Sequence, residues 1–151
     1  YSVRNFMIIP KQFFTTSIIE RRKPLAETAR RAGWVGCDIL LSNIPDSGKI
    51  YLVRDGVVIP RSTVLTKWRK TLFLREENKM SVRGWMLDIM RCIERVDRVN
   101  FTLDDMYTFE SELAAIHPEN NHIKDKIRQQ LQMLRDKGYI DFVSRGHYRL
   151  I

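Results

Sequence analysis

The segment 122–138 carries side chains whose types and spacing could read DNA bases. Its apolar residues recur at helical spacing, and at 100° per residue a polar face lies opposite them. That face comprises Asp125, Arg128, Gln129 and Gln132, with Asn121 and His122 at its N-terminal tip. Arginine and glutamine can form paired hydrogen bonds with guanine and adenine edges in the major groove. Lys124 and Lys126 flank the face and have the charge to contact phosphates.

The stretch TARRAGWVGC, residues 28–37, places a large aromatic side chain between two glycines. Trp34 lies between Gly33 and Gly36, shortly after the pair Arg30 and Arg31. A tight bend favours glycine, because glycine adopts positive φ values freely. We therefore expect a loop that holds the indole outward. The alternative is that Trp34 is a core anchor between two domains.

The elements that position these residues begin with strands and one helix. The apolar run RNFMII, ended by Pro10, predicts a buried strand. Asp55–Gly56 lies between two apolar stretches, which is the pattern of a type I′ hairpin. Ser62 is the expected N-cap of a helix with one apolar face, formed by Leu65, Trp68 and Leu72. These elements are too few for a complete α/β domain, and we expect the chain to be the C-terminal part of a longer protein.

After a charged linker at 75–84, the apolar pattern becomes helical. The first helix has one apolar face, formed by Trp85, Ile89, Cys92, Ile93 and Val96. Thr102 and Asp105 have the spacing of a capping box at the start of the second helix. Its expected buried stripe comprises Met106, Phe109, Leu113 and Ile116.

The turn HPENN separates the second helix from the third, and either Asn120 or Asn121 is the expected cap. Gly138 is the expected end of the third helix. Two short strands follow, with Arg145 in the turn between them. Three helices and a β-hairpin are the order of a winged helix-turn-helix, which would place Arg145 against the DNA backbone.

Charge favours a polyanionic partner. The net charge is +8, and residues 1–79 hold 15 Lys/Arg against 7 Asp/Glu, whereas residues 80–151 hold 11 of each. Nucleic acid is the commonest polyanion for such a protein. The two cysteines and three histidines are scattered, which predicts reduced thiols and no zinc site in this chain. Without a signal-peptide layout or an apolar run of the roughly 18–20 residues that span a bilayer, we expect a cytoplasmic protein.

Beyond these patterns, the sequence closely resembles the DpnI-type methyl-directed restriction endonucleases. The matching stretches run in order from about residue 6 to the C-terminus: PKQF, RKPLA.TARRAGW.GC, LV.DG, RGW, FTL.DMY.FES.L and NNHIK.KIRQQLQ.LRDK. The resemblance implies an enzyme that cleaves duplex DNA at G-A-T-C sites carrying N6-methyladenine, with two parts that both read the site. The implied fold is α+β: residues 1–79 form the C-terminal part of a PD-(D/E)xK nuclease domain, and residues 80–151 form a winged-helix domain.

The resemblance also assigns roles to the first half. It places Trp34 in the loop that meets the methylated adenine, where an indole face offers an apolar wall to a methyl group. Burying one methyl group contributes roughly 0.8 kcal/mol, so strong discrimination needs more than one such contact. Arg30 and Arg31 would then contact phosphates.

The catalytic carboxylates and lysine of the family lie upstream of Tyr1, and so does its cysteine-bound zinc. Mg²⁺ and a structural zinc are therefore implied for the full-length enzyme, and no cofactor for this chain. Asp46 and the stretch Glu77–Lys79 imitate the nuclease motif, but we expect them in a turn and a linker. The motif needs its acid and lysine on adjacent core strands near one metal ion. We expect this chain to bind DNA without cutting it.

Two other interpretations are open at this point. A winged-helix transcriptional regulator would bind DNA without a nuclease partner, as a dimer on a palindrome. No segment of this sequence looks like a dimerisation helix, however, and we expect a monomer. A protein-interaction module would use the third helix against another protein and would show no salt-dependent DNA binding.

Overall fold

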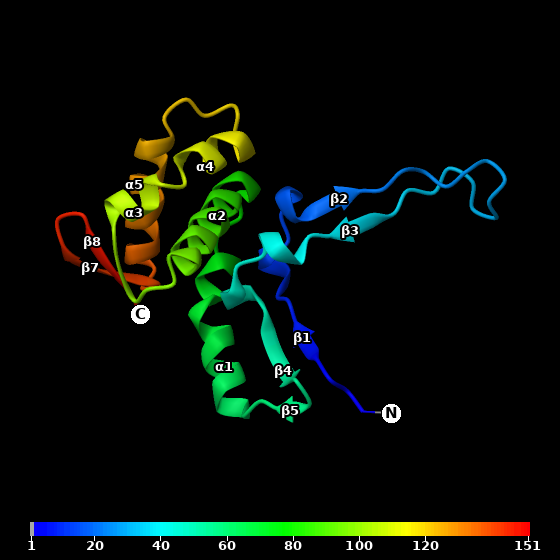
Figure 1. Cartoon of the computed structure of the whole chain (residues 1–151), viewed down its shortest axis with the longest axis horizontal. Helices are drawn as coiled ribbons and strands as arrows, with labels where there is room; N and C mark the ends of the chain where they lie inside the picture. The colour runs from blue at the N-terminus through cyan, green and yellow to red at the C-terminus, as the bar shows by residue number, and fades with distance from the viewer. Residues whose placement is uncertain (1) are drawn as a thin grey trace.

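The computed structural model describes residues 2–151, an α+β arrangement whose two halves meet at the long helix α2 (Figure 1). The helices are α1 (Arg61–Lys70), α2 (Met80–Val96), α3 (Leu103–Tyr107), α4 (Glu110–Ile116) and α5 (Ile123–Asp136). The strands are β1 (Phe6–Ile8), β2 (Ile19–Arg21), β3 (Cys37–Ile39), β4 (Ile50–Arg54), β5 (Val57–Val58), β6 (Asn100–Thr102), β7 (Ile140–Ser144) and β8 (His147–Leu150).

The first half contains a three-stranded antiparallel sheet in the order β1-β4-β5. Asp55 and Gly56 join β4 to β5 with φ values of 51° and 81°, which confirms the predicted type I′ turn. The strand predicted in RNFMII is also present, but the expectation that it is buried is wrong. Phe6 and Ile8 are about half exposed.

Helix α1 differs from its prediction in two respects. Its N-cap is Pro60, and Ser62 lies inside the first turn, where its side chain forms no cap. Val64 and Leu65 are only partly covered, and Trp68 is 38% exposed, so α1 has no fully buried side chain. The helix therefore lies on the surface beside β4 rather than in a core.

A long hairpin projects from the body of the molecule (Figure 1). Strands β2 and β3 pair at its base, and the pairing continues outward through Arg22 N–H to Gly36 O and Leu25 N–H to Trp34 O. We call residues 19–39 the arm. Almost all of its side chains are exposed, so its shape comes from backbone hydrogen bonds rather than from a core.

The second half has the predicted winged-helix order. The Thr102–Asp105 capping box is present, and its hydrogen bonds to Thr102 lower the pKa of Asp105. The predicted second helix is divided into α3 and α4 near Thr108 and Phe109, which is a correction to the single helix expected. Strand β6 was not predicted; it pairs with β8 to give a sheet in the order β6-β8-β7.

The core is continuous across both halves. Helix α2 packs against α5, whose predicted inner residues Ile123, Ile127, Leu131 and Leu134 are all buried. Phe13, Ile18, Ile44 and Leu74 of the first half belong to the same apolar cluster. Cys92 lies within this cluster, and burial raises the pKa of its thiol to about 12.

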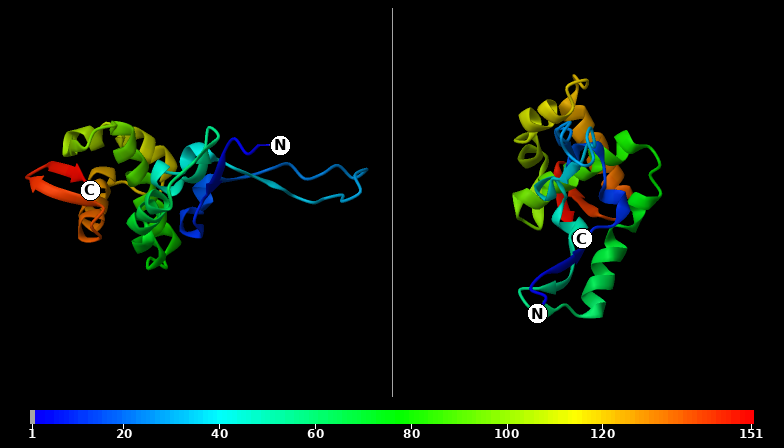
Figure 2. Two further views of the ribbon diagram at one scale, coloured as in Figure 1. Left: turned by 90° about the horizontal axis from the view of Figure 1, so that it is seen from below. Right: turned by 90° about the vertical axis from the view of Figure 1, so that its right-hand side faces the viewer.

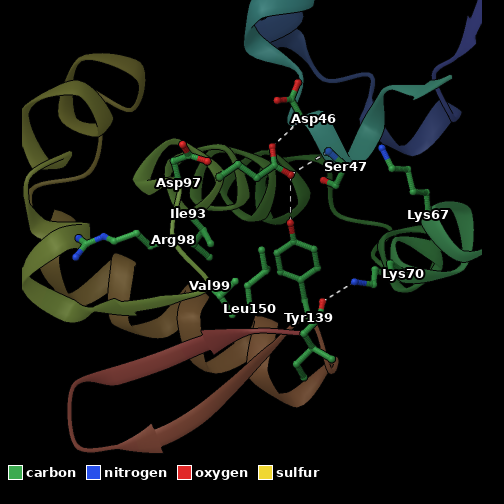
Figure 3. A pocket seen from close by; sticks show the side chains of 12 residues that line it. Asp46, Ser47, Lys67, Lys70, Ile93, Asp97, Arg98, Val99, Tyr139 and Leu150 are labelled. Atoms are coloured by element: carbon green, nitrogen blue, oxygen red, sulfur yellow. Dashed lines mark hydrogen bonds between the residues drawn. The ribbon is translucent and has the colours of Figure 1, made fainter. Parts of the chain in front are cut away.

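Glu94 of α2 joins the two halves. Its carboxylate accepts hydrogen bonds from the backbone N–H groups of Asp46 and Ser47 and from the hydroxyl of Tyr139 at 3.2 Å. Asp46 and Ser47 belong to the first half, and Tyr139 directly precedes β7, so one carboxylate ties three segments together. A cleft of about 410 Å³ opens beside Glu94, between α1, α2 and the end of β8 (Figure 3).

Candidate nucleic-acid interface

Helix α5 presents the predicted polar face to solvent. Its apolar stripe is buried and Gly138 ends it with a φ of +72°, as expected. The exposed residues of the predicted set are Asn121, His122, Lys124, Asp125, Arg128, Gln129 and Gln132. The expected asparagine cap is not formed: His122 is the N-cap, and the Asn120 side chain accepts a hydrogen bond from the His122 N–H instead.

Tyr107 of α3 contacts two cations of this face, Arg128 and Lys124. Arg128 Nη1 donates to the Tyr107 hydroxyl at 2.7 Å, and Arg128 also forms an ion pair with Asp125. Lys124 lies over the Tyr107 ring, 5.3 Å from its centroid, and pairs with Glu110 at 3.4 Å. The hydrogen bond to Tyr107 raises the pKa of Arg128.

Sequence reasoning missed Tyr107, although one signal was available. It follows the core residue Met106 but falls outside the apolar stripe of its helix, and there a tyrosine usually seeks a polar partner for its hydroxyl. The amides of α5 are less constrained. Gln129 accepts a hydrogen bond from Lys126 Nζ at 2.8 Å, and Gln132 has no side-chain hydrogen bond within residues 2–151.

Two residues of α2 contact His117, at the start of the turn that precedes α5. The Asp88 carboxylate is buried and lies 2.8 Å from His117 Nε2, and the His117 ring stacks on Trp85 with centroids 3.7 Å apart. His117 ends α4, so these contacts set where the turn leaves toward Asn121 and His122. Asp88 was not predicted as part of the interface, because nothing local links it to a residue 29 positions away.

Arg145 lies at the tip of the β7–β8 hairpin, as predicted. Its side chain is exposed, and it has no carboxylate partner in the part of the chain that the structure describes. Its backbone carbonyl faces His147 Nδ1 at 3.0 Å, and Gly146 closes the turn with a φ of +73°. A guanidinium presented in this way is available to a phosphate.

Trp34 lies on the arm and is 55% exposed, which contradicts the alternative that it is a core anchor. Its indole packs over Gly36: a Cβ atom there would come within 2.9 Å of Trp34 Cζ3. Gly33 has the positive φ expected for the bend, +76°. Arg30 and Arg31 are exposed beside it, and neither forms an ion pair with a described residue.

The predicted residues fall into two groups that are far apart. The β7–β8 hairpin, which carries Arg145 and which we call the wing, lies beside α5. The arm extends from the other end of the molecule (Figures 1 and 2). That both parts read the methylated site, as the resemblance implies, stays a prediction. The arm and the winged helix are two separate surfaces of the molecule.

The residues described here do not fit either metal implied by the resemblance. Asp46 begins a short 3-10 turn and pairs with Lys49, while Glu77 lies in the loop before α2 and accepts a hydrogen bond from the Lys79 N–H. They are not on adjacent strands. Within residues 2–151, no group of three or more His, Cys, Asp or Glu side chains could hold a metal ion. None of the helices there is long and apolar enough to cross a bilayer.

Comparison with known families agrees with this arrangement. The model of the Dam-replacing family matches residues 1–77, and the model of the Dam-replacing helix-turn-helix domain matches residues 81–150. The second match agrees with α3 to α5 and the wing, and it makes DNA the partner of this half. The first covers the arm and the sheet β1-β4-β5, for which the elements alone gave no assignment. The chain therefore belongs to the Dam-replacing, DpnI-type family, whose members recognise DNA in a methylation-dependent way within a restriction system.

Proposed function

We propose that this chain recognises N6-methyladenine in G-A-T-C sites of duplex DNA, as the recognition part of a restriction endonuclease that cleaves methylated DNA. The observation that carries the proposal is the half-exposed indole of Trp34, held over Gly36 beside two unpaired arginines. In this proposal Arg30 and Arg31 position the arm on phosphates, and Trp34 contacts the methyl group.

The chemistry of the modified base explains why an aromatic side chain is needed. Unmodified adenine shows an acceptor at N7 and an amino donor at N6 in the major groove. Methylation replaces one N6–H with an apolar group, so an amide that hydrogen-bonds to both positions loses a partner. A flat apolar surface gains dispersion contacts and buries the methyl group, which contributes roughly 0.8 kcal/mol.

The winged helix contributes sequence recognition to the same function. Arg128 has the geometry for guanine, Gln129 and Gln132 are candidates for the other base edges, and Asn121 and His122 lie at the helix N-terminus that enters the groove. Lys124 and Arg145 are positioned for the backbone on either side. Because Arg128 and Lys124 are paired with Asp125 and Glu110, DNA has to replace these partners on binding.

Equilibrium binding at one fixed salt concentration tests this function, with a fully methylated G-A-T-C duplex, its unmethylated twin and a scrambled duplex. We expect the methylated duplex to bind several-fold more tightly than its twin. Trp34→Ala should abolish that preference, and Trp34→Phe should keep part of it.

Trp68→Ala is the matched control, because it removes another partly exposed tryptophan at a distance from the arm. It should leave the methyl preference unchanged. Equal binding of the wild-type chain to methylated and unmethylated duplexes would contradict the proposed specificity. Strand nicking by the chain in the presence of Mg²⁺ would contradict its assignment as a recognition part.

A further inference from the structure

Helix α1 lies on the surface, and its two faces differ in composition. At 100° per residue, Val64, Leu65 and Trp68 fall on the side facing the sheet. The remaining face holds three hydroxyl groups and three cations but no acid; its members are Ser62, Thr63, Thr66, Lys67, Arg69 and Lys70. We call this set the α1 polar face. Hydroxyl and cationic side chains are the types that contact DNA phosphates.

The cations of this face are largely unpaired. Lys70 donates a hydrogen bond to the Ile151 carbonyl at 2.7 Å, whereas Lys67 and Arg69 have no ion pair or side-chain hydrogen bond within residues 2–151. These cations lie in the last turn of α1, where the helix dipole favours positive charge. It does not account for three hydroxyl groups on the same face.

Acidic groups lie near one edge of the α1 polar face. Lys67 and Lys70 line the cleft beside Glu94 (Figure 3). Asp46 and Asp97 line the same cleft. Glu94 is already occupied by two backbone N–H groups and the Tyr139 hydroxyl. None of the three acids approaches a cation of α1 within ion-pair distance in the described chain.

The α1 polar face belongs to a helix on the same side of the molecule as α5. Helix α5 packs against α3 and α4, and the segment after α5 and the C-terminus contact the region of α1 and the turn that follows it, through Lys137–Glu76 and Lys70–Ile151. The α5 N-terminus points away from α1, and its C-terminal end is directed toward it (Figure 1). The α1 polar face therefore lies near the C-terminal end of α5, at the opposite end from Asn121 and His122.

We infer that the α1 polar face is a second contact surface for the phosphate backbone of duplex DNA, separate from both the arm and the recognition helix. It adds affinity without reading sequence. The inference needs duplex DNA as the partner but does not need the methyl specificity proposed above.

The salt dependence of binding tests this surface, because each neutralised phosphate contributes a slope of about 0.9 to log K against log salt. We compare the chain with a Lys67→Gln/Arg69→Gln double variant on methylated and scrambled duplexes. Loss of two phosphate contacts should reduce the slope by about 1.8 on both duplexes. The ratio of the two affinities should not change.

The matched control is Arg135→Gln/Lys137→Gln, which removes the same net charge from cations paired with Asp136 and Glu76. The slope of log K against log salt should fall clearly less in this control than in the α1 double variant. Equal changes in the two double variants would overturn the inference, and so would an unchanged slope in the α1 variant. Should the α1 double variant fail to fold, Arg69→Gln alone should lower the slope by about 0.9.

The two proposals fail in different ways. If the wild-type chain shows no methyl preference but the α1 slope falls as expected, the proposed specificity fails and this surface stands. If methyl preference is present and the α1 slope does not change, only the α1 inference fails.

Discussion

The basic side chains of residues 2–79 and of residues 80–151 differ in their partners. In the first half, only Arg22 and Lys49 pair with a carboxylate. In the second half, most cations are paired: Arg91, Arg95, Arg98, Lys124, Arg128, Arg135, Lys137 and Arg149. The first half therefore contains more cations than acids, and most of its cations form no ion pair with a described residue.

This difference separates two tasks. Unpaired surface cations attract phosphates over a distance and make binding strongly salt-dependent. Paired cations such as Arg128 must exchange an internal partner for a base or phosphate, so they gain little from a poorly fitting sequence. We expect the first half to supply salt-dependent affinity and α5 to supply sequence discrimination.

The largest effect should follow from reversing charge in the arm. Arg30→Glu/Arg31→Glu replaces two unpaired cations with anions, so affinity for every duplex should fall by at least about tenfold at low salt. The salt slope should fall as well. Titrations at several salt concentrations measure both, and Arg30→Gln/Arg31→Gln should give an intermediate loss. An unchanged affinity would remove the arm from the contact surface.

Arg128→Ala should affect discrimination more than salt dependence. A bidentate contact between arginine and guanine contributes about 1–3 kcal/mol against the wrong base. Binding to the cognate duplex should weaken accordingly, while binding to a scrambled duplex changes little. Competition between the two duplexes checks this, and a uniform loss on both would instead assign Arg128 to the backbone.

Asp125→Asn should make one cation of the second half behave like those of the first. Removing the carboxylate frees Arg128 from its ion pair, so scrambled duplexes should bind several-fold more tightly with a slope steeper by about 0.9. The cognate ratio should decrease. The variant also removes an acid from the first turn of α5, so its thermal stability should fall slightly, by about 0.3–1 kcal/mol.

Tyr107→Phe should have the smallest effect of the four. It removes the hydroxyl that holds Arg128 but keeps the ring under Lys124, and one hydrogen bond contributes about 0.5–1.5 kcal/mol. Cognate affinity should fall a few-fold, with the salt slope preserved. Tyr107→Leu removes both contacts and should lose more; equal losses in the two variants would mean that the hydroxyl carries the whole effect.

The parts of this structure that sequence predicts are those with short-range signals. Thr102 and Asp105 are three residues apart and form their capping box, and Asp55–Gly56 forms its turn because both residues tolerate positive φ. The exposed face of α5 follows from helical periodicity alone. Each of these depends on a few neighbouring residues.

The parts that sequence did not predict depend on distant partners. Glu94 contacts residues more than 40 positions away on both sides, and β6 exists because β8 is available to pair with it. Phe6 was expected to be buried because it lies in an apolar strand, but the sequence of a strand does not show whether another element packs on it. The arm was expected as a loop, since its pairing joins residues with no apolar alternation between them.

The arm has a consequence for handling this chain. It joins the body only at its base, none of its side chains belongs to the shared core, and it contains four sites for trypsin at Arg21, Arg22, Arg30 and Arg31, because Lys23 is followed by Pro24. Exposed hairpin tips are where proteases cut first. Brief digestion should therefore nick the arm while the body stays folded, and a bound methylated duplex should shield these bonds from cleavage.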